Sequence, residues 1–121
     1  MRIGVLDYGA GNLRNVYRAI SFLGLEYVSI KSSSDFGSLD KLIIPGVGAF
    51  KVAMDQLNKN GLVEPIKDYS LNGMPAMGIC LGMQLLFGRS EEFGHCEGLG
   101  LMEGSLLHIS EQYKSSHKDR I

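Results

Sequence analysis

Apolar and polar positions alternate along this chain with two different periods. Four short apolar segments predict buried β-strands: residues 3–6, 27–30, 41–44 and 75–79. Four segments with apolar side chains at helical spacing predict helices: residues 13–23, 49–58, 62–71 and 81–87. Strands that alternate with helices are typical of βαβ units. We therefore expect an α/β fold, with a doubly wound, mostly parallel sheet that helices cover on both faces.

The pattern is weaker in the remaining segments. Residues 31–38 are polar and serine-rich and predict a loop, and residues 91–98 predict another. Residues 105–109 predict one more strand. The tail from residue 110 to 121 is polar and has no apolar period, so we expect the chain to end before its fold is complete.

Glycine-rich turns follow three of the predicted strands. They come after Asp7, after Ile44 and at Cys80. In parallel sheets, ligands bind outside the carboxyl ends of the strands. We therefore expect these three turns to form the functional edge of the sheet.

Composition excludes several classes of protein. The 121 residues predict one small domain, and a net charge of −1 provides no basic field for nucleic acid or an anionic membrane. No apolar run approaches membrane-spanning length, and the start is too quickly polar for a signal peptide. The two cysteines have neither metal-ligand spacing nor a disulfide framework. We expect a cytoplasmic protein that binds no metal and no nucleic acid.

Cys80 lies between two glycines, where a predicted strand meets a predicted helix. Residues 78–82 have the pattern G-x-C-x-G, the thiol form of the G-x-S-x-G nucleophile turn. Such a turn lifts the side chain above the sheet, and its glycines let neighbouring backbone pass without a clash. The positive end of the next helix favours the thiolate, and the Leu81 amide faces an oxyanion on an acyl carbon held by Cys80.

A buried structural role is the ordinary interpretation of a free cysteine. For Cys80, the flanking glycines and the helix start favour a nucleophile instead. Cys96 lies in a polar segment without that arrangement. We expect Cys96 to be a surface or packing residue.

Two further glycine turns have different interpretations. Residues 45–50, Pro-Gly-Val-Gly-Ala-Phe, can present backbone N–H groups to an anion, or simply form a tight turn. Beside Cys80, this loop supplies the second donor of an oxyanion hole. Residues 8–12 resemble a dinucleotide loop, but Leu13 and Arg14 stand where the third glycine should fall, and no acidic residue is placed as that motif requires. We therefore expect no nicotinamide cofactor.

A thiol nucleophile that turns over an amide needs a base, usually a histidine oriented by a carboxylate. His95, His108 and His117 lie in a predicted loop, a predicted strand and the polar tail. None is followed by a carboxylate in a convincing pattern, so we expect three surface or core histidines. The sequence indicates a nucleophile without its base.

Four blocks of sequence resemble the class I (triad) glutamine amidotransferases. Residues 78–87 are similar to the nucleophile segment of that family, and residues 45–50 to its oxyanion loop. Residues 7–13 and 98–101 narrow the resemblance to the HisH glutaminase subunits of imidazole glycerol phosphate synthases. The resemblance covers nearly the whole chain in order, and the four blocks together are highly specific.

The resemblance implies a flavodoxin-like domain that hydrolyses L-glutamine through a γ-glutamyl thioester, with residues 1–121 as the N-terminal part of that single domain. It implies the following roles: Cys80 as nucleophile, Gly46, Val47, Gly48 and Leu81 as oxyanion site, Gln84 as glutamine-binding residue beside Gly48, and Asn12 at a partner interface. The implied partner is a HisF-type cyclase, a (β/α)8 barrel that forms a heterodimer and uses the ammonia to make imidazole glycerol phosphate and AICAR.

The chain departs from the family in one large respect. Family members are longer, and their triad histidine and glutamate lie in the carboxyl-terminal third. No residue here matches either, so we expect a fragment or truncation without glutaminase turnover by itself. Three alternatives remain open: a HisH-like paralogue that serves another acceptor, a truncated non-catalytic interaction domain, and a doubly wound cysteine hydrolase, which Gln84 and residues 7–13 disfavour.

Overall fold

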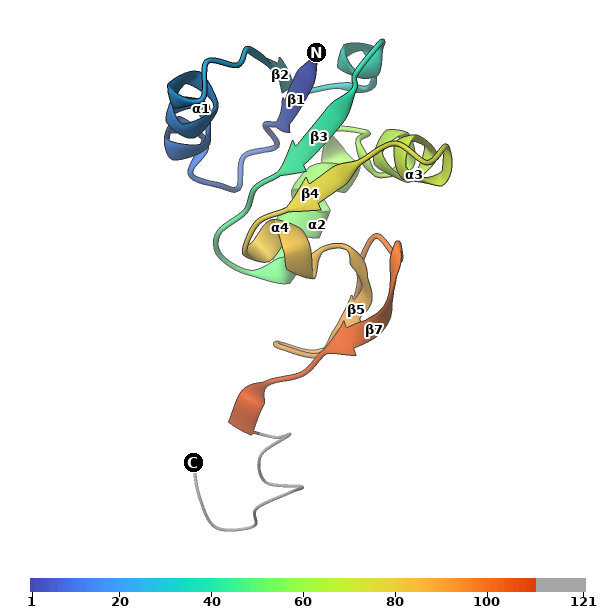
Figure 1. Ribbon diagram of the computed structural model, residues 1–121. Coiled ribbons are helices and arrows are strands. Elements are labelled where there is room, and N and C mark those ends of the chain that lie inside the picture. Colours follow the sequence, from blue (N-terminus) through green and yellow to red (C-terminus); the bar gives the residue numbers. More distant parts are fainter. Residues whose placement is uncertain (111–121) are drawn as a thin grey trace.

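A parallel sheet forms the centre of the molecule (Figure 1). The computed structural model describes residues 1–110, and its larger sheet has the order β2-β1-β3-β4 with every pair parallel. The strands are β1 (Ile3–Leu6), β2 (Tyr27–Ile30), β3 (Lys41–Ile44) and β4 (Ala76–Gly78). Strand order reverses between β1 and β3, because the chain runs outward to β2 and then crosses back. The carboxyl ends of β1 and β3 therefore flank the crevice in which doubly wound sheets bind ligands.

Helices lie on both faces of this sheet, which confirms the predicted fold class. α1 (Leu13–Phe22) covers one face, and α2 (Phe50–Lys59) and α3 (Val63–Leu71) cover the other (Figure 1). The apolar positions of α2 are buried in the main core: Phe50, Ala53, Met54 and Leu57. No helix within residues 1–110 is long and apolar enough to span a bilayer.

The chain after β4 differs most from the prediction. α4 spans only Leu81–Gln84 and β5 (Phe87–Ser90) follows it, so the helix predicted over residues 81–87 is wrong in its second half. The helix stops because tertiary hydrogen bonds replace helical ones. The Leu85 carbonyl accepts a hydrogen bond from the distant Leu99 amide at 2.8 Å.

β5 belongs to a second, smaller sheet. It pairs with β6 (Cys96–Glu97) and β7 (Met102–Leu106). The loop predicted over residues 91–98 therefore contains a strand, and the strand predicted over residues 105–109 is wrong in its bounds. β6 has only two residues, too few to show a period. Most of β7 is exposed on both faces, so its sequence carries no apolar alternation.

The loop predicted over residues 31–38 contains one turn of 3-10 helix, Ser33–Phe36. The Asp35 carboxylate accepts hydrogen bonds from the backbone N–H groups of Lys31 and Ser32, at 2.9 and 3.0 Å. These bonds hold the pKa of Asp35 below its ordinary value. A local side-chain cap of this kind leaves no apolar pattern in the sequence.

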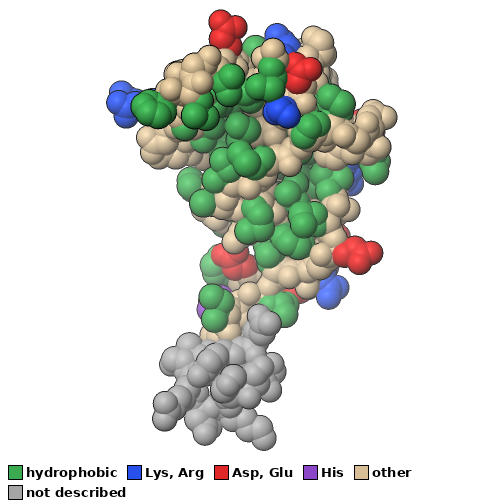
Figure 2. Space-filling model, in the orientation of Figure 1, with side chains coloured by type: hydrophobic (Ala, Val, Ile, Leu, Met, Phe, Trp, Pro, Cys, Tyr) green, Lys and Arg blue, Asp and Glu red, His purple; other side chains and the backbone are tan. Residues whose placement is uncertain are grey.

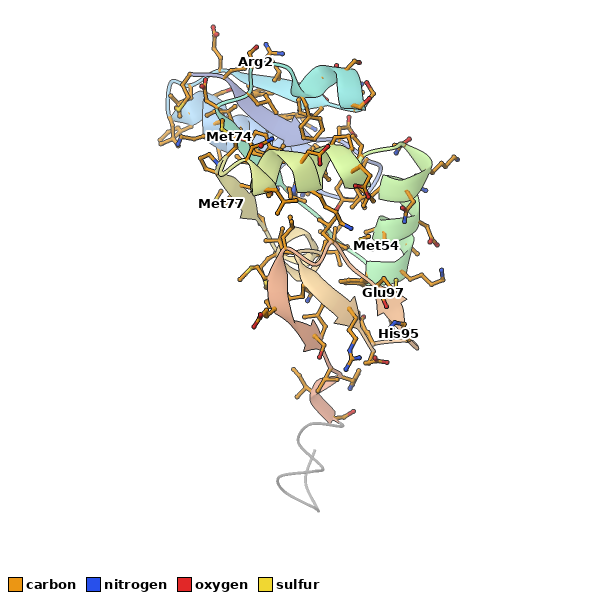
Figure 3. All side chains as sticks on the ribbon, turned by 90° about the vertical axis from the view of Figure 1, so that its right-hand side faces the viewer. Arg2, Met54, Met74, Met77, His95 and Glu97 are labelled. Carbon is orange, nitrogen blue, oxygen red and sulfur yellow. The ribbon has the colours of Figure 1, made fainter. Side chains whose placement is uncertain are left out.

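One part of the larger sheet is not covered by a helix. Hydrophobic side chains gather on the face that Figure 2 shows. A cavity of about 190 Å³ is lined largely by apolar residues of β3 and β4, including Ile43 and Met77. Met77 is 54% exposed, and Figure 3 shows it on the side of β4 away from α3. Within the described residues, helices therefore cover both faces of the sheet only near its first strands, and one face is uncovered at β3 and β4.

Candidate active site

Cys80 lies at the tip of a sharp turn between β4 and α4. Its backbone angles are φ 55° and ψ −120°, in the positive-φ region that residues with a Cβ rarely adopt. Among the described non-glycine residues, only Ser38 shares a positive φ. Cys80 is exposed. The structure therefore places this cysteine as the G-x-C-x-G spacing predicts, on strained backbone of the kind that is concentrated at functional sites.

The two glycines of this turn are required by close backbone contacts. A Cβ on Gly82 would overlap the Ile44 carbonyl oxygen. A Cβ on Gly78 would lie 2.5 Å from the Met83 Cα. Neither neighbour is the end of a flexible side chain, so neither position can accept a larger residue without moving backbone. The turn is pressed against the end of β3.

Hydrogen bonds join this turn to the loop that follows β3. The Ile44 carbonyl accepts from the Ile79 N–H at 2.9 Å, and the Gly46 carbonyl accepts from the Leu81 N–H at 3.2 Å. The predicted oxyanion loop and the nucleophile turn are therefore in direct contact. Gly46 is buried, whereas Val47 is 57% exposed.

In this conformation the Leu81 amide already has an acceptor. The C=O and N–H of a trans peptide point in opposite directions, and the described chain contains no cis peptide. Because the Gly46 carbonyl points at the Leu81 N–H, the Val47 N–H points away from it. The residues expected to bind an oxyanion lie together, but their two amides do not converge.

The turn after β1 contacts the same loop from the other side. Tyr8 is only 2% exposed, and its hydroxyl donates a hydrogen bond to the Pro45 carbonyl at 2.7 Å. Burial raises the pKa of this phenol, so it remains a neutral donor. A Cβ on Gly11 would lie 3.4 Å from the Gly46 nitrogen. The structure thus brings together all three predicted glycine turns.

Asn12 ends the first of these turns and caps α1. It is exposed, and its side chain accepts a hydrogen bond from the Asn15 N–H at 3.5 Å. Capping explains an asparagine at this position. Its role in a partner interface stays a prediction.

Known proteins share the family and the fold of this chain. Residues 4–118 match the family described as Glutamine amidotransferase class-I. The chain belongs to this family. One solved structure, described as a glutamine amidotransferase, matches with a TM-score of 0.75 and 23% identity over 87% of this chain and 55% of that chain. A second, described as part of a putative GMP synthase from Thermoplasma acidophilum, has a TM-score of 0.53 and 24% identity over 69% of this chain and 42% of that chain. These structural likenesses show the fold.

Curated relatives narrow the comparison. The imidazole glycerol phosphate synthase subunit HisH of Bacillus cereus (strain B4264) is 45% identical over 115 residues, 95% of this chain and 55% of the relative. The protein of the same name from Sulfurimonas denitrificans is 48% identical over 105 residues, 87% of this chain and 51% of the relative. The chain therefore spans about half the length of the curated relatives it matches.

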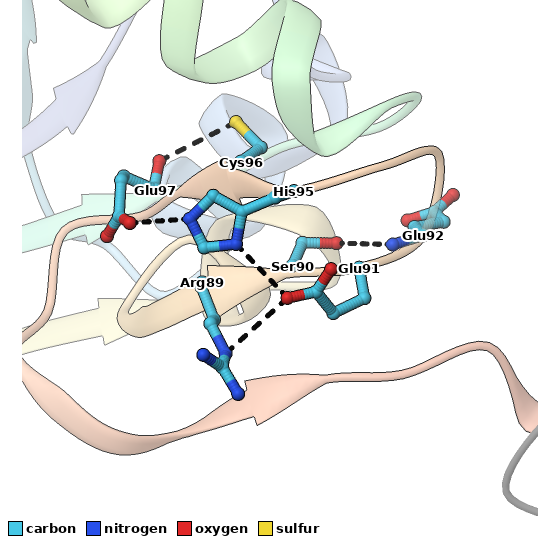
Figure 4. A network of polar contacts seen from close by, with 7 residues as sticks. All are labelled: Arg89, Ser90, Glu91, Glu92, His95, Cys96 and Glu97. Carbon is cyan, nitrogen blue, oxygen red and sulfur yellow. Dashed lines mark hydrogen bonds and ion pairs between the residues drawn. The ribbon is translucent and has the colours of Figure 1, made fainter.

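His95 is an exposed residue whose hydrogen-bond partners are carboxylates and not Cys80. Its Nδ1 lies 3.1 Å from Glu91 Oε1 and its Nε2 lies 2.6 Å from Glu97 Oε1 (Figure 4). Hydrogen bonding, with Glu97 first and then Glu91, raises the pKa of His95. The expectation of a surface histidine is confirmed.

The other candidate bases lie elsewhere. His108 is exposed and follows β7, and its Nδ1 lies 2.6 Å from Ser110 Oγ. It was expected in a strand, and that placement is wrong because β7 ends at Leu106. His117 lies outside the described residues. Within residues 1–110, no histidine forms a hydrogen bond with Cys80, and no group of three or more His, Cys, Asp or Glu side chains could hold a metal ion.

Cys96 differs from Cys80 in its surroundings. It is half-buried at the start of β6 and packs against the main core. Burial is the main cause that raises the pKa of its thiol. The expectation of a surface or packing residue is confirmed.

A cavity of about 250 Å³ opens beside α4. Its lining residues are Gln84, Glu92, Leu106, Leu107, His108 and Ile109. Gln84 lies one turn after Cys80, and its N–H donates to the Cys80 carbonyl at 3.2 Å. Glu92 was not identified from the sequence, because an isolated carboxylate in a segment without a period gives no signal. An amide and a carboxylate beside apolar walls can hold a small polar ligand.

Proposed function

We propose that this chain is the N-terminal part of a single amidotransferase domain, the glutaminase subunit of an imidazole glycerol phosphate synthase. The backbone of Cys80 carries the proposal, since positive φ on an exposed cysteine at a strand end fits a nucleophile. The family match and the HisH names of relatives 45–48% identical support it.

The proposed reaction begins with attack of the Cys80 thiolate on the carboxamide carbon of glutamine. A carbon–sulfur bond forms, and the carbonyl electron pair moves onto oxygen. When the tetrahedral adduct collapses, the protonated amide nitrogen leaves as ammonia and a γ-glutamyl thioester remains. Water then cleaves the thioester to glutamate and the free thiol. The leaving nitrogen must gain a proton and the attacking water must lose one, so both steps need an acid–base group, which we expect from a part of the protein beyond these 121 residues.

Stabilising the oxyanion requires a change at one peptide. The Leu81 N–H donates a hydrogen bond to the Gly46 carbonyl at 3.2 Å, so in this conformation it is not available to an oxyanion. A half-turn of the Gly46–Val47 peptide would withdraw that carbonyl and direct the Val47 N–H toward the same point. Beyond Val47 the loop is loosely packed, because Gly48 has φ 98° and no atom lies within 4 Å of its Cβ position.

Glutamine would bind in the cavity beside α4. Its side chain must reach Cys80, and its ammonium and carboxylate need partners farther away. Gln84 offers an amide one helical turn from Cys80, and Glu92 offers a negative charge on the wall of the same cavity. We assign Glu92 to the substrate ammonium because opposite charges attract strongly in a partly enclosed site.

The ammonia would pass to a HisF-type cyclase in a cytoplasmic heterodimer, which gives the complex its lyase activity. Asn12 is exposed at the active edge of the sheet, where such a partner would meet the glutaminase. A paralogue that serves another acceptor would share every feature of the site. A truncated, non-catalytic interaction domain is the alternative from another class, and the absence of a histidine bonded to Cys80 within residues 1–110 favours it.

Two measurements test the proposed function. Reading the gene past the codon for Ile121 should show an open frame with a histidine and a glutamate, and a stop codon there would favour the non-catalytic alternative. In the full-length protein with its cyclase, Cys80→Ser should lower glutamine hydrolysis by roughly 10³-fold or more. Cys96→Ser is the matched control. Equal activity of both variants would contradict the proposal.

A further inference from the structure

We propose that Tyr8 is a positioning residue that fixes one end of the oxyanion loop while the next peptide turns. This inference rests on the proposed glutaminase function. Tyr8 is buried, and its hydroxyl donates to the Pro45 carbonyl at 2.7 Å, across 37 residues of sequence.

The contact replaces a missing backbone bond. Pairing between β1 and β3 ends at Val5 and Ile43, because the chain leaves β1 after Leu6. Carbonyl groups of a strand alternate between its two neighbours, so the Pro45 carbonyl faces the β1 side without a backbone donor from that strand. The Tyr8 hydroxyl supplies the donor and extends the ladder by one step.

The neighbouring carbonyls are held by the other side of the site. Ile44 accepts from Ile79 at 2.9 Å, and Gly46 accepts from Leu81 at 3.2 Å. Three consecutive carbonyls are thus fixed by three donors, of which only the one on Pro45 is a side chain. If the Gly46–Val47 peptide turns, the Leu81 bond breaks, whereas the Pro45 bond remains.

The Tyr8 hydroxyl also limits where the loop can move. A Cβ on Gly46 would lie 2.7 Å from the hydroxyl oxygen, so the phenol is pressed against the Gly46 backbone. The fixed Pro45–Gly46 peptide confines rotation to the next peptide. Without the hydroxyl, the whole loop can shift, and the Val47 N–H loses its fixed direction toward the oxyanion.

Tyr8→Phe tests this role, and the chain offers a matched control. Tyr69 is also buried, and its hydroxyl donates to the Pro75 carbonyl at 3.0 Å, but Pro75 precedes β4 at the opposite edge of the sheet. Each Phe variant removes one phenol-to-proline hydrogen bond. In the full-length protein with its cyclase, Tyr8→Phe should lower kcat for glutamine roughly tenfold and change KM less than about twofold. Tyr69→Phe should change neither.

The outcomes separate this inference from the proposed function. If Tyr8→Phe has the same kcat as Tyr69→Phe, the proposed role of Tyr8 is wrong. The proposed glutaminase function would still stand in that case, provided that Cys80→Ser is inactive. Full activity in Cys80→Ser would overturn the function itself. Thermal unfolding of both Phe variants separates a kcat effect from a loss of folded protein.

A second measurement uses the unsubstituted protein and needs no variant to fold. The Tyr8 hydroxyl proton should exchange with water slowly enough to give a proton resonance, with a cross-peak to the Gly46 α-protons. Exchange as fast as that of an exposed tyrosine would overturn the proposed anchor.

Discussion

Gly82 has less space around its Cβ position than Gly78, the other glycine of the Cys80 turn, since a Cβ on Gly82 overlaps the Ile44 carbonyl oxygen. The neighbour is backbone, so relief requires a shift of β3 or of the turn. We expect Gly82→Ala to lower the free energy of unfolding by about 3 kcal/mol, measured by urea denaturation. Gly37→Ala is the control, because no atom lies within 4 Å of its Cβ position and its φ is −54°. If both substitutions change the free energy of unfolding equally, Gly82 is not tightly packed against the Ile44 carbonyl.

The two cysteines should react at different rates. Cys80 is exposed, whereas Cys96 is half-buried and burial raises the pKa of its thiol. Since the thiolate is the reactive form, iodoacetamide at neutral pH should label Cys80 first. Peptide mass mapping over a time course measures both rates on the same sample. Faster labelling of Cys96 would contradict the assignment of Cys80 as the accessible nucleophile.

Glu92 makes a prediction about substrate binding. If its carboxylate holds the ammonium of glutamine in the cavity beside Gln84, then Glu92→Gln should raise KM for glutamine roughly tenfold with little change in kcat. Steady-state glutamine hydrolysis by the full-length complex measures both constants. Glu103→Gln, in β7, is a control for the loss of one surface carboxylate. An unchanged KM in Glu92→Gln would remove Glu92 from the substrate site.

His95 joins the segment after β5 to β6 through hydrogen bonds with Glu91 and Glu97. These contacts raise the pKa of His95, so its protonated form stabilises the folded state. That contribution is complete below the unfolded pKa of about 6.5 and is lost as pH rises through the higher folded pKa. Stability should therefore decrease as pH rises above about 6.5.

Denaturation at a series of pH values measures this decrease, and His95→Gln should make it smaller. His108→Gln, which leaves the carboxylate pair in place, should preserve it. A pH dependence that persists unchanged in His95→Gln would assign the effect to another group.

The central strands and helices could be predicted because their apolar residues recur with a regular period, and in α2 the residues of that period, such as Phe50 and Leu57, are buried. The second sheet could not, since β6 has two residues and β7 is mostly exposed. α4 was predicted too long because Leu85 bonds to Leu99, a contact that no local pattern encodes. Local periodicity predicted which segments are helices and which are strands. The prediction failed where tertiary hydrogen bonds determine where an element ends.

The candidate site divides in the same way. The positive φ of Cys80 follows from one short motif because backbone strain is local, whereas the closest contact of Gly82 is with the Ile44 carbonyl of β3. Tyr8 was not identified, because its partner Pro45 is 37 residues away and only the order of the strands brings them together. The direction of the Gly46–Val47 peptide could not be predicted either, because a sequence motif specifies residue types and not the orientation of their backbone amides.

In the whole molecule, the three glycine-rich turns place Cys80, the proposed nucleophile of this amidotransferase family member, at one edge of a parallel sheet. The chain spans about half the length of its curated relatives, with 55% of the Bacillus cereus HisH protein matched. Within residues 1–110 no histidine forms a hydrogen bond with Cys80, so we expect turnover to require further parts of the full-length protein. The 121-residue chain by itself should release no ammonia from glutamine, in an assay that detects ammonia from the full-length complex.

The account depends on a covalent intermediate at Cys80. The most direct measurement is to mix the full-length protein and its cyclase with glutamine, quench with acid within the first turnovers, and map peptides by mass spectrometry. We expect a γ-glutamyl adduct on the peptide that contains Cys80, its absence in Cys80→Ser, and no adduct on the peptide that contains Cys96. Glutamine hydrolysis at an undiminished rate in Cys80→Ser, or an adduct on another residue, would contradict the account.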